Sequence, residues 1–193
     1  MIVAAVLASG LSQRMGADKL ALPFAGKTVL WHAVAPLLSA RVDRIMVVTA
    51  PGKEYVLPDD ARIESLSNPD HGEGMASSLR LACSRTGPEA ESLMVCLGDK
   101  PLLRSETVVE AIRRFEAESC DVLVSCFEGQ AGHPVLFASR LMPALMRLKG
   151  DEGARRIVAS HHGVHRFPCD DEGVVFDIDT DEDYTNLLSR SRA

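Results

Sequence analysis

The feature that most constrains the fold is an apolar strand followed directly by a loop of small residues. Residues 2–7 form a nearly unbroken apolar run rich in Val and Ala. Such a run is typical of a strand that is buried on both faces of a parallel sheet. The loop at residues 7–19 reads LASGLSQRMGADK and places two glycines and two cations after that strand. A strand with this kind of loop predicts an α/β chain that binds its ligand at the loop.

The composition of this loop is typical of a phosphate-binding loop. Gly10 and Gly16 lack a Cβ, so their backbone can approach an anion closely and turn its N–H groups inward. Arg14 and Lys19 add positive charge that the N–H dipoles do not supply. We interpret the loop as one that wraps the phosphates of a nucleoside triphosphate, with an ordinary strand-to-helix turn as the alternative.

Two common phosphate-binding motifs are excluded by spacing. A dinucleotide-binding fingerprint requires glycines where Ser12 and Met15 stand. A Walker A loop requires Lys directly after its second glycine, whereas Ala and Asp separate Gly16 from Lys19. The loop therefore belongs to another class of nucleotide site.

Strand and helix patterns alternate along the rest of the chain. We expect strands at residues 44–49, 62–66, 92–97, 121–127, 135–137 and 174–179, and helices at residues 28–40, 75–82, 105–118 and 141–148. This alternation predicts a doubly wound, mostly parallel α/β sheet with ligands beyond the carboxyl ends of its strands. A length of 193 residues fits one domain.

Charge and composition argue against several classes of partner. The formal net charge of −6 disfavours a nucleic-acid surface, because such surfaces neutralise phosphates with basic patches. No apolar run reaches membrane length, and the N-terminus lacks the basic region of a signal peptide. The five cysteines form no CxxC pair, which is typical of reduced thiols. We expect a cytoplasmic protein that binds neither nucleic acid nor membrane.

Two further loops bring polar residues to the expected ligand edge. Residues 68–81 read NPDHGEGMASSLRL, a glycine-rich start with hydroxyls that fits a base or phosphate site as well as an ordinary helix cap. Asp99 follows the strand at residues 92–97, where a carboxylate can hold Mg²⁺ beside a triphosphate. Capping of the next helix by Asp99 is the alternative, but Ser105 can do that capping.

The C-terminal half contains candidate residues for a second substrate and for a metal. His133 in a Gly-His-Pro turn can face a substrate, although a lone histidine in a turn is more often solvated. Arg155 carries a guanidinium that can bind a phosphate. Asp177 and Asp179 alternate along the last expected strand, so both carboxylates face one side. Thr180 and Asp183, which follow, have the spacing of a capping box.

The histidines near residue 160 do not predict a zinc site. His161, His162 and His165 lie close together in the chain, but no cysteine stands at a suitable spacing from them. We therefore expect a solvated loop in this region.

Six segments together carry a resemblance to a known family. LASGLSQRMGADK, NPDHGEGMASSL, GDKP, GHPVLF, GDEGAR and DIDTDEDY resemble, in order and spacing, the nucleotidyltransferases of molybdenum cofactor biosynthesis. The cytidylyltransferases among these MobA-like NTP transferases are most similar, and the molybdopterin guanylyltransferases are next. The resemblance implies one Rossmann-like domain over residues 1–193, of the nucleotide-diphospho-sugar transferase type. It also implies transfer of a nucleoside monophosphate from an NTP to a phosphate group, with release of pyrophosphate.

The resemblance also implies roles for individual residues. Arg14, Lys19 and Asp99 would be catalytic, and Asp99 and Asp179 would hold Mg²⁺, with Asp177 as the alternative second ligand. His133 and Arg155 would face the acceptor, the terminal phosphate of molybdopterin. The residues implied to bind the substrates are Leu7, Ala8, Ser9, Gly10, Leu11, Ser12, Gly16, Lys19, Asn68, Ser77, Gly98, His133 and Arg155.

The chain departs from the family pattern at two positions. Ser9 stands where the guanylyl enzymes have Gly and the cytidylyl enzymes have Ala. A Cβ at this position crowds a purine, so we expect CTP rather than GTP as the donor. Lys100 stands where the family usually has Met, and it either pairs with Asp99 in competition with Mg²⁺ or points away from the site.

Three interpretations are therefore open. In the first, the chain transfers CMP to molybdopterin and docks transiently on a molybdoenzyme or its chaperone. In the second, it uses GTP or another phosphorylated acceptor. In the third, it is a nucleotide-binding maturation factor without transfer activity.

Overall fold

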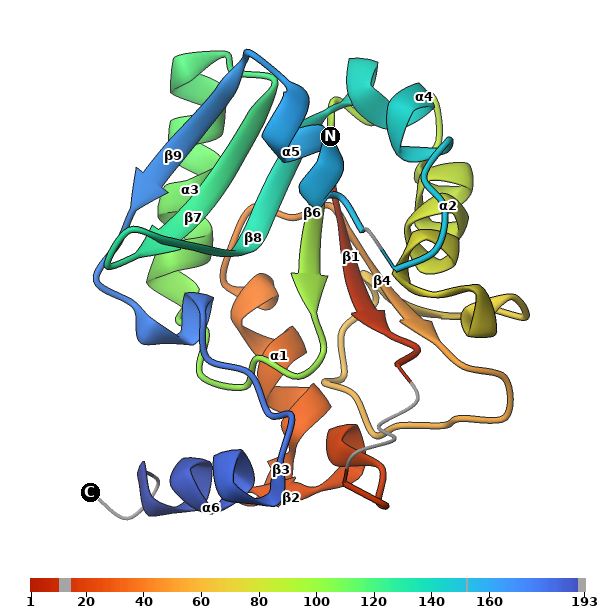
Figure 1. Cartoon of the computed structure of the whole chain (residues 1–193), viewed down its shortest axis with the longest axis vertical. Helices are drawn as coiled ribbons and strands as arrows, with labels where there is room; N and C mark the ends of the chain where they lie inside the picture. Colours follow the sequence, from red (N-terminus) through yellow and green to blue (C-terminus); the bar gives the residue numbers. More distant parts are fainter. Residues whose placement is uncertain (11–14, 152, 191–193) are drawn as a thin grey trace.

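A sheet of seven strands crosses the centre of the molecule in the order β5-β4-β1-β6-β8-β7-β9 (Figure 1). The structure is a computed structural model that describes residues 1–10, 15–151 and 153–190. The parallel neighbours on one side are β5 (Ile63–Ser67), β4 (Arg44–Thr49), β1 (Ile2–Ala8) and β6 (Ser92–Leu97). The remaining strands are β8 (Gln130–Ala138), which is antiparallel to both neighbours, β7 (Val122–Phe127) and β9 (Val164–Pro168). The predicted mostly parallel α/β sheet is confirmed.

Helices cover both faces of this sheet because the side chains of β1 alternate between two cores. Ala4 and Val6 pack in a core with α1 (Val29–Leu38) and α3 (Ser105–Glu118). Val3 and Ala5 pack on the other face, whose helices are α2 (Met75–Thr86), α4 (Met142–Leu145) and α5 (Arg155–Ser160). All seven residues of β1 are buried, which explains why its sequence is apolar without alternation.

The described helices do not include a membrane span. In residues 1–10, 15–151 and 153–190, none combines the length and the apolar character that crossing a bilayer requires.

The strand predicted at residues 174–179 is wrong. A 3-10 turn, η4 (Glu172–Val174), stands at its start, and the residues after it form no strand. Ile178 is fully buried, and its N–H donates to the carbonyl oxygen of Asp99 at 3.3 Å. A single backbone contact, rather than a strand ladder, therefore fixes this segment beside the end of β6.

Strand β9 was not expected, because its sequence lacks a strand pattern. Within Val164–Pro168 only Phe167 is buried, so this edge strand shows no apolar run. His165 Nδ1 lies 2.6 Å from Glu118 Oε2, and His161 Nε2 lies 2.5 Å from Asp121 Oδ2. The two histidines thus pair with carboxylates, and His162 and His165 are exposed, in line with the solvated region that we expected.

The C-terminal helix packs against a small hairpin below the sheet (Figure 1). The hairpin consists of β2 (Pro23–Phe24) and β3 (Lys27–Thr28), and the Tyr184 hydroxyl of α6 (Asp181–Arg190) donates to the carbonyl oxygen of Pro23 at 2.6 Å. The predicted capping box at the start of α6 is confirmed. Thr180 N–H donates to Asp183 Oδ2 at 2.8 Å, and Asp183 N–H donates to Thr180 Oγ1 at 3.2 Å.

Helix α3 is capped by a carboxylate from a distant part of the chain. Its N-cap is Arg104, and no local side chain caps it, so the cap predicted at Ser105 is wrong. Asp171, which is 3% exposed, accepts hydrogen bonds from Arg104 N–H at 3.0 Å and from Thr107 Oγ1 at 2.6 Å. The segment before η4 therefore holds the start of α3.

Candidate active site

Lys19 joins two carboxylates that come from distant parts of the chain. It begins the 3-10 turn η1 (Lys19–Ala21), after the loop that leaves β1. Its Nζ donates to Asp99 Oδ2 at 2.7 Å and to Asp179 Oδ1 at 2.9 Å. Burial alone lowers the pKa of Lys19, but the two carboxylates outweigh burial and raise that pKa above its ordinary value. The ammonium is therefore charged at neutral pH.

The carboxylate of Asp99 offers an oxygen to a ligand. Its Oδ2 accepts from Lys19, whereas its Oδ1 is buried and has no hydrogen-bond partner among the described residues. Asp179 is 47% exposed at its side chain, so it also reaches the solvent side of the site. A buried orphan oxygen beside a second carboxylate is a donor set that fits a hard divalent cation such as Mg²⁺.

Substrate oxygens would have to complete such a coordination sphere. Residues 1–10, 15–151 and 153–190 contain no group of three or more His, Cys, Asp or Glu side chains that could hold a metal ion. Mg²⁺ bound by one or two carboxylates together with substrate phosphates is the usual arrangement in phosphoryl-transfer sites.

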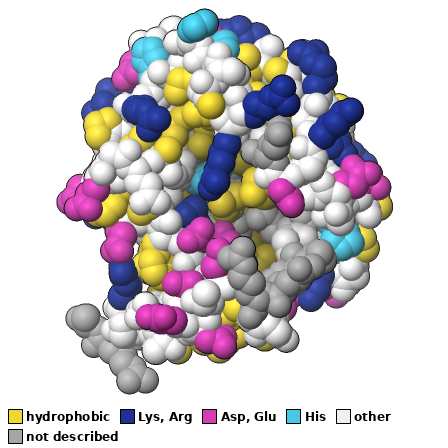
Figure 2. Space-filling view, viewed as in Figure 1, with side chains coloured by type: hydrophobic (Ala, Val, Ile, Leu, Met, Phe, Trp, Pro, Cys, Tyr) yellow, Lys and Arg dark blue, Asp and Glu magenta, His cyan; other side chains and the backbone are white. Residues whose placement is uncertain are grey.

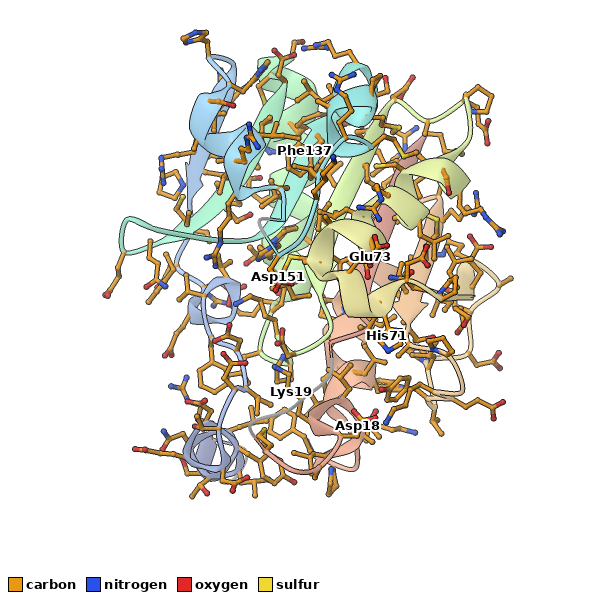
Figure 3. The ribbon with its side chains drawn as sticks, turned by 45° about the vertical axis from the view of Figure 1, so that its right-hand side comes forward. Asp18, Lys19, His71, Glu73, Phe137 and Asp151 are labelled. Carbon is orange, nitrogen blue, oxygen red and sulfur yellow. The ribbon has the colours of Figure 1, made fainter. Side chains whose placement is uncertain are left out.

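A pocket of about 580 Å³ opens in front of this ion pair. Its lining on the sheet side is formed by Leu7, Ala8, Ser9, Gly10, Met15, Lys19, Leu20, Leu97, Asp99 and Asp179. The other side is formed by residues 71–75, Ser78 and Asp151. Figure 3 shows Lys19 on one side of this space, with His71, Glu73 and Asp151 on the other. The pocket lies at the carboxyl ends of β1 and β6, where an α/β sheet binds its ligands.

The hydroxyl of Ser9 is tied to helix α2. Ser9 is 8% exposed, and its Oγ lies 2.5 Å from Ser78 Oγ. Asn68 Nδ2 donates to Ser78 Oγ at 3.0 Å and to Ser77 Oγ at 2.8 Å, and Ser77 Oγ donates to the carbonyl oxygen of Gly74 at 2.8 Å. This network of buried hydrogen bonds fixes the first residue of the loop against the start of α2.

The predicted site residues divide between the pocket lining and its support. Asn68 and Ser77 support the lining through Ser78, which sequence reasoning did not select. Gly98 packs against the core, because a Cβ there would lie 2.9 Å from Leu30 Cδ1. Gly16 has a φ of +63°, the left-handed region that favours glycine.

Three of the predicted residues lie outside the described part of the chain. They are Leu11, Ser12 and Arg14.

The start of helix α2 is closed by a loop from the C-terminal half. Met75 N–H donates to Asp151 Oδ1 at 3.3 Å, and Ala76 N–H donates to the carbonyl oxygen of Gly150 at 3.0 Å. Gly74 has a φ of +93°, and a Cβ there would lie 2.2 Å from Asp151 Oδ1. Asp151 therefore caps the start of α2 and also lines the pocket.

A second group of polar residues lies beside the pocket without lining it. Lys100 is 4% exposed, and its Nζ donates to the carbonyl oxygen of Phe176 at 3.4 Å. Burial lowers the pKa of Lys100 and raises that of Asp177, which lies in the same electrostatic environment. Among the described residues Lys100 forms no ion pair with Asp99, so the predicted pairing is not seen, and its Nζ contacts Phe176 instead.

His133 belongs to this second group. Its Nδ1 is buried and has no hydrogen-bond partner in the part of the chain that the structure describes. Burial, together with the charges of Lys100 and Arg155, lowers the pKa of His133 to about 3. The imidazole is therefore neutral at physiological pH.

Fold and site together define the class of the protein. A mostly parallel sheet with flanking helices and a pocket over the first strand–loop unit is the architecture of nucleotidyltransferases of the nucleotide-diphospho-sugar transferase type. A nucleotidyl transferase from Methanothermobacter shares this fold, with a TM-score of 0.79, 21% identity, and coverage of 100% of this chain and 98% of that one. Residues 4–164 match the model of the MobA-like NTP transferase domain. The chain belongs to this family and is a nucleotidyltransferase.

Two curated relatives span nearly the whole chain. The purine catabolism protein PucB of Bacillus subtilis is 33% identical and covers 95% of this chain and 94% of its own length. The molybdenum cofactor cytidylyltransferase of Escherichia coli is 25% identical and covers 96% of this chain and 94% of its own length. The resemblance inferred from sequence motifs is thereby confirmed at the level of the family.

A solved structure with a bound metal is also similar. The manganese complex of Rv0371c from Mycobacterium tuberculosis has a TM-score of 0.78 and 26% identity, and it covers 97% of this chain and 98% of that one. A divalent cation is thus present in a structure of the same fold.

Proposed function

We propose that this protein transfers CMP from CTP to the phosphate of molybdopterin or of the molybdenum cofactor and releases pyrophosphate. The observation that supports this proposal is that Lys19 donates hydrogen bonds to both Asp99 and Asp179, and that all three residues line the pocket. Two carboxylates and a cation at this edge can hold a metal ion and a triphosphate together. The cytidylyltransferase relative supports the choice of donor and acceptor.

The proposed reaction needs no side-chain nucleophile. An oxygen of the acceptor phosphate attacks the α-phosphorus in line, the new P–O bond forms, and the bond from the α-phosphorus to the bridging oxygen of pyrophosphate breaks. Catalysis then consists of positioning and charge neutralisation. Lys19 supplies positive charge to the phosphates, and Arg14 is proposed to do the same from the loop.

A divalent cation is proposed to complete the site. Asp99 and Asp179 would hold Mg²⁺, which supplies charge neutralisation at the phosphate oxygens. Asp179 is preferred to Asp177 as the second ligand because Lys19 joins Asp179 to Asp99. The manganese complex of the mycobacterial neighbour supports a divalent metal on this fold.

The remaining predicted residues are assigned to the two substrates. Residues 7–12 and 16 would wrap the triphosphate, with Asn68, Ser77 and Gly98 supporting the pocket wall. His133 and Arg155 would face the acceptor. The whole chain, residues 1–193, is proposed to form one domain of this type in the cytoplasm.

Ser9 supports a pyrimidine donor. Ser9 lines the pocket and its Oγ lies 2.5 Å from Ser78 Oγ, which supports a wall that is held in place against a larger base. We therefore expect Ser9→Gly to increase the ratio of GTP to CTP turnover. An unchanged ratio in this variant would argue that the base is selected elsewhere.

The recipient of the product is proposed from the relatives. A molybdoenzyme or its chaperone would dock transiently to receive the nucleotide-bearing cofactor. The relative with 33% identity is named for purine catabolism, which supports an enzyme of purine breakdown as that recipient.

One experiment separates the alternatives. Purified protein is incubated with Mg²⁺, molybdopterin and each NTP in turn, and pyrophosphate release is measured. We expect release with CTP that depends on molybdopterin. Release with GTP would assign a guanylyltransferase, and release only with another phosphorylated acceptor would reassign the acceptor. Nucleotide binding without release under every condition would favour a non-catalytic maturation factor.

A further inference from the structure

Three basic side chains lie beside the pocket on three separate elements. Lys100 follows β6, His133 lies near the start of β8, and Arg155 begins α5. Because β8 is antiparallel to β6, with Val95 opposite Val135, the start of β8 lies at the same edge as the end of β6. Figure 2 shows basic side chains close to a group of acidic ones near the centre of this face. These three residues therefore lie at the same sheet edge as the pocket, although they do not line it.

Lys100 is the unusual member of this group. Lys100 is only 4% exposed. A lysine ammonium has three N–H donors, and each of them needs a partner when it is buried. Within residues 1–10, 15–151 and 153–190 the one hydrogen bond of Lys100 is the 3.4 Å contact with Phe176, and it forms no ion pair. Burial of an ammonium with so few partners costs free energy, so packing alone does not explain Lys100.

Three carboxylates lie near Lys100 and oppose the effect of burial on its pKa. Asp177, Asp99 and Asp179 all act on it and favour its charged form, in opposition to burial. An incoming phosphate dianion would be repelled by the same three carboxylates. A fixed positive charge among them lowers that repulsion at the point where the dianion must approach.

Arg155 adds a second cation beside Lys100, and His133 adds a neutral imidazole on which both cations act. Neutral His133 carries one N–H, and its buried Nδ1 has no partner in the described chain. Arg155 is exposed, and the described residues hold it by no hydrogen bond or ion pair. Lys100 and Arg155 both lie close enough to His133 for their charges to act on it.

We propose that Lys100 binds the phosphate group of the acceptor, together with His133 and Arg155, and presents it to the α-phosphorus of the bound NTP. This inference rests on the proposed function and adds a specific residue and ligand class to it, a phosphate monoester. Lys100 donates hydrogen bonds to the phosphate and transfers no proton. The bond that forms joins an acceptor oxygen to the α-phosphorus, and the bond that breaks releases pyrophosphate.

Binding of inorganic phosphate tests the subsite without any NTP. Phosphate is titrated into the wild type and into Lys100→Met, Lys149→Met and Lys19→Met, and affinity is measured by calorimetry. We expect Lys100→Met to weaken phosphate binding about tenfold or more, since a charge-assisted contact is lost. Exposed Lys149 is the matched control, and Lys149→Met is expected to bind phosphate like the wild type. Lys19→Met is also expected to retain binding, because the ion at this subsite does not contact Lys19.

Steady-state kinetics show whether Lys100 contacts the substrate or has only a structural role. We expect Lys100→Met to raise the KM for molybdopterin about tenfold or more and to change the KM for CTP by less than about twofold. The midpoint of thermal unfolding of this variant should equal or exceed that of the wild type, because a poorly paired buried charge has been removed.

Several results would overturn the inference. Lys100 would be removed from the acceptor site by any of three results. Phosphate binding could survive in Lys100→Met, it could be lost only in Lys19→Met, or it could be absent from the wild type. A clear fall in the unfolding midpoint of Lys100→Met would make Lys100 structural. Failure of the proposed function has a different signature, namely phosphate binding that depends on Lys100 in a protein that releases no pyrophosphate with any NTP.

Discussion

The ammonium of Lys19 lies 2.7 Å from Oδ2 of Asp99, although 80 positions of the chain separate the two residues. One stands after the loop that leaves β1, and the other stands after β6. These two strands are hydrogen-bonded neighbours, so the parallel sheet brings the two loops together at one edge. The contact also leaves Oδ1 of Asp99 buried without a partner in the described chain, which makes this pair the centre of the candidate site.

Loss of the Lys19 charge should slow catalysis without unfolding the protein. We expect Lys19→Met to lower kcat/KM about 100- to 1,000-fold, since one preorganised electrostatic contact to the reacting phosphates is removed. Lys53→Met is the matched control, because Lys53 Nζ also forms an ion pair, with Asp18 at 2.7 Å, but is half exposed. Its activity should stay within about twofold of the wild type. Equal losses in the two variants would argue against a specific role for Lys19.

Gly10 should be needed for nucleotide binding and not for the stability of the fold. A Cβ added to Gly10 would meet no atom of the described residues within 4 Å, its chain neighbours aside. We therefore expect Gly10→Ala to change the free energy of unfolding by less than about 0.5 kcal/mol. Its affinity for CTP should fall about tenfold, because the added methyl group obstructs the approach of a phosphate to the backbone. Calorimetric titration with CTP measures this, and undiminished affinity would place the phosphates elsewhere.

The carboxylate of Asp171 should contribute to stability and not to catalysis. It is almost fully buried and accepts hydrogen bonds from Arg104, Thr107 and Gly173, so Asp171→Ala removes the cap of α3. We expect a loss of about 2 kcal/mol in urea unfolding. Ser105→Ala should change stability by less than about 0.5 kcal/mol, since no side-chain bond caps α3 from that position. A larger loss for Ser105→Ala than for Asp171→Ala would contradict this assignment.

His133 should make the protein less stable in mild acid. Its pKa is lowered from 6.5 to about 3 in the folded state, so below pH 6.5 the unfolded chain binds a proton that the folded protein does not. The contribution of His133 to stability is thus complete above pH 6.5 and is lost progressively between pH 6.5 and about 3. We expect His133→Gln to lose less stability than the wild type between pH 7 and pH 5, as measured by the urea midpoint. An identical loss in both proteins would mean that His133 titrates normally.

The fold could be predicted where burial leaves a local pattern in the sequence. Strands β4 and β6 and helix α3 have the expected bounds, because each carries an apolar run or a helical stripe of its own. The expected strand at residues 174–179 failed because Ile178 is buried by contact with the end of β6 and not by pairing in the sheet. Strand β9 was missed because an edge strand with a single buried residue has no such pattern.

The site residues that belong to recognisable sequence motifs could be predicted from the sequence. Lys19, Asp99 and Asp179 were selected from sequence, and the structure places them in contact. Asp151 at the start of α2 was not selected, because the residue that it caps lies 76 positions away. Ser78 was passed over for the neighbouring Ser77, since the sequence does not reveal which of two adjacent hydroxyls faces the pocket. Long-range capping and side-chain direction are therefore what the structure adds.

The most direct test of the account compares three carboxylates in one assay. Pyrophosphate release from CTP with Mg²⁺ and molybdopterin is measured for Asp99→Ala, Asp179→Ala and Asp177→Ala, with circular dichroism to verify that each variant is folded. We expect Asp99→Ala to reduce kcat about 100- to 1,000-fold and Asp179→Ala to reduce it clearly, whereas Asp177→Ala keeps kcat within about tenfold of the wild type. Turnover like that of the wild type in folded Asp99→Ala would contradict the account.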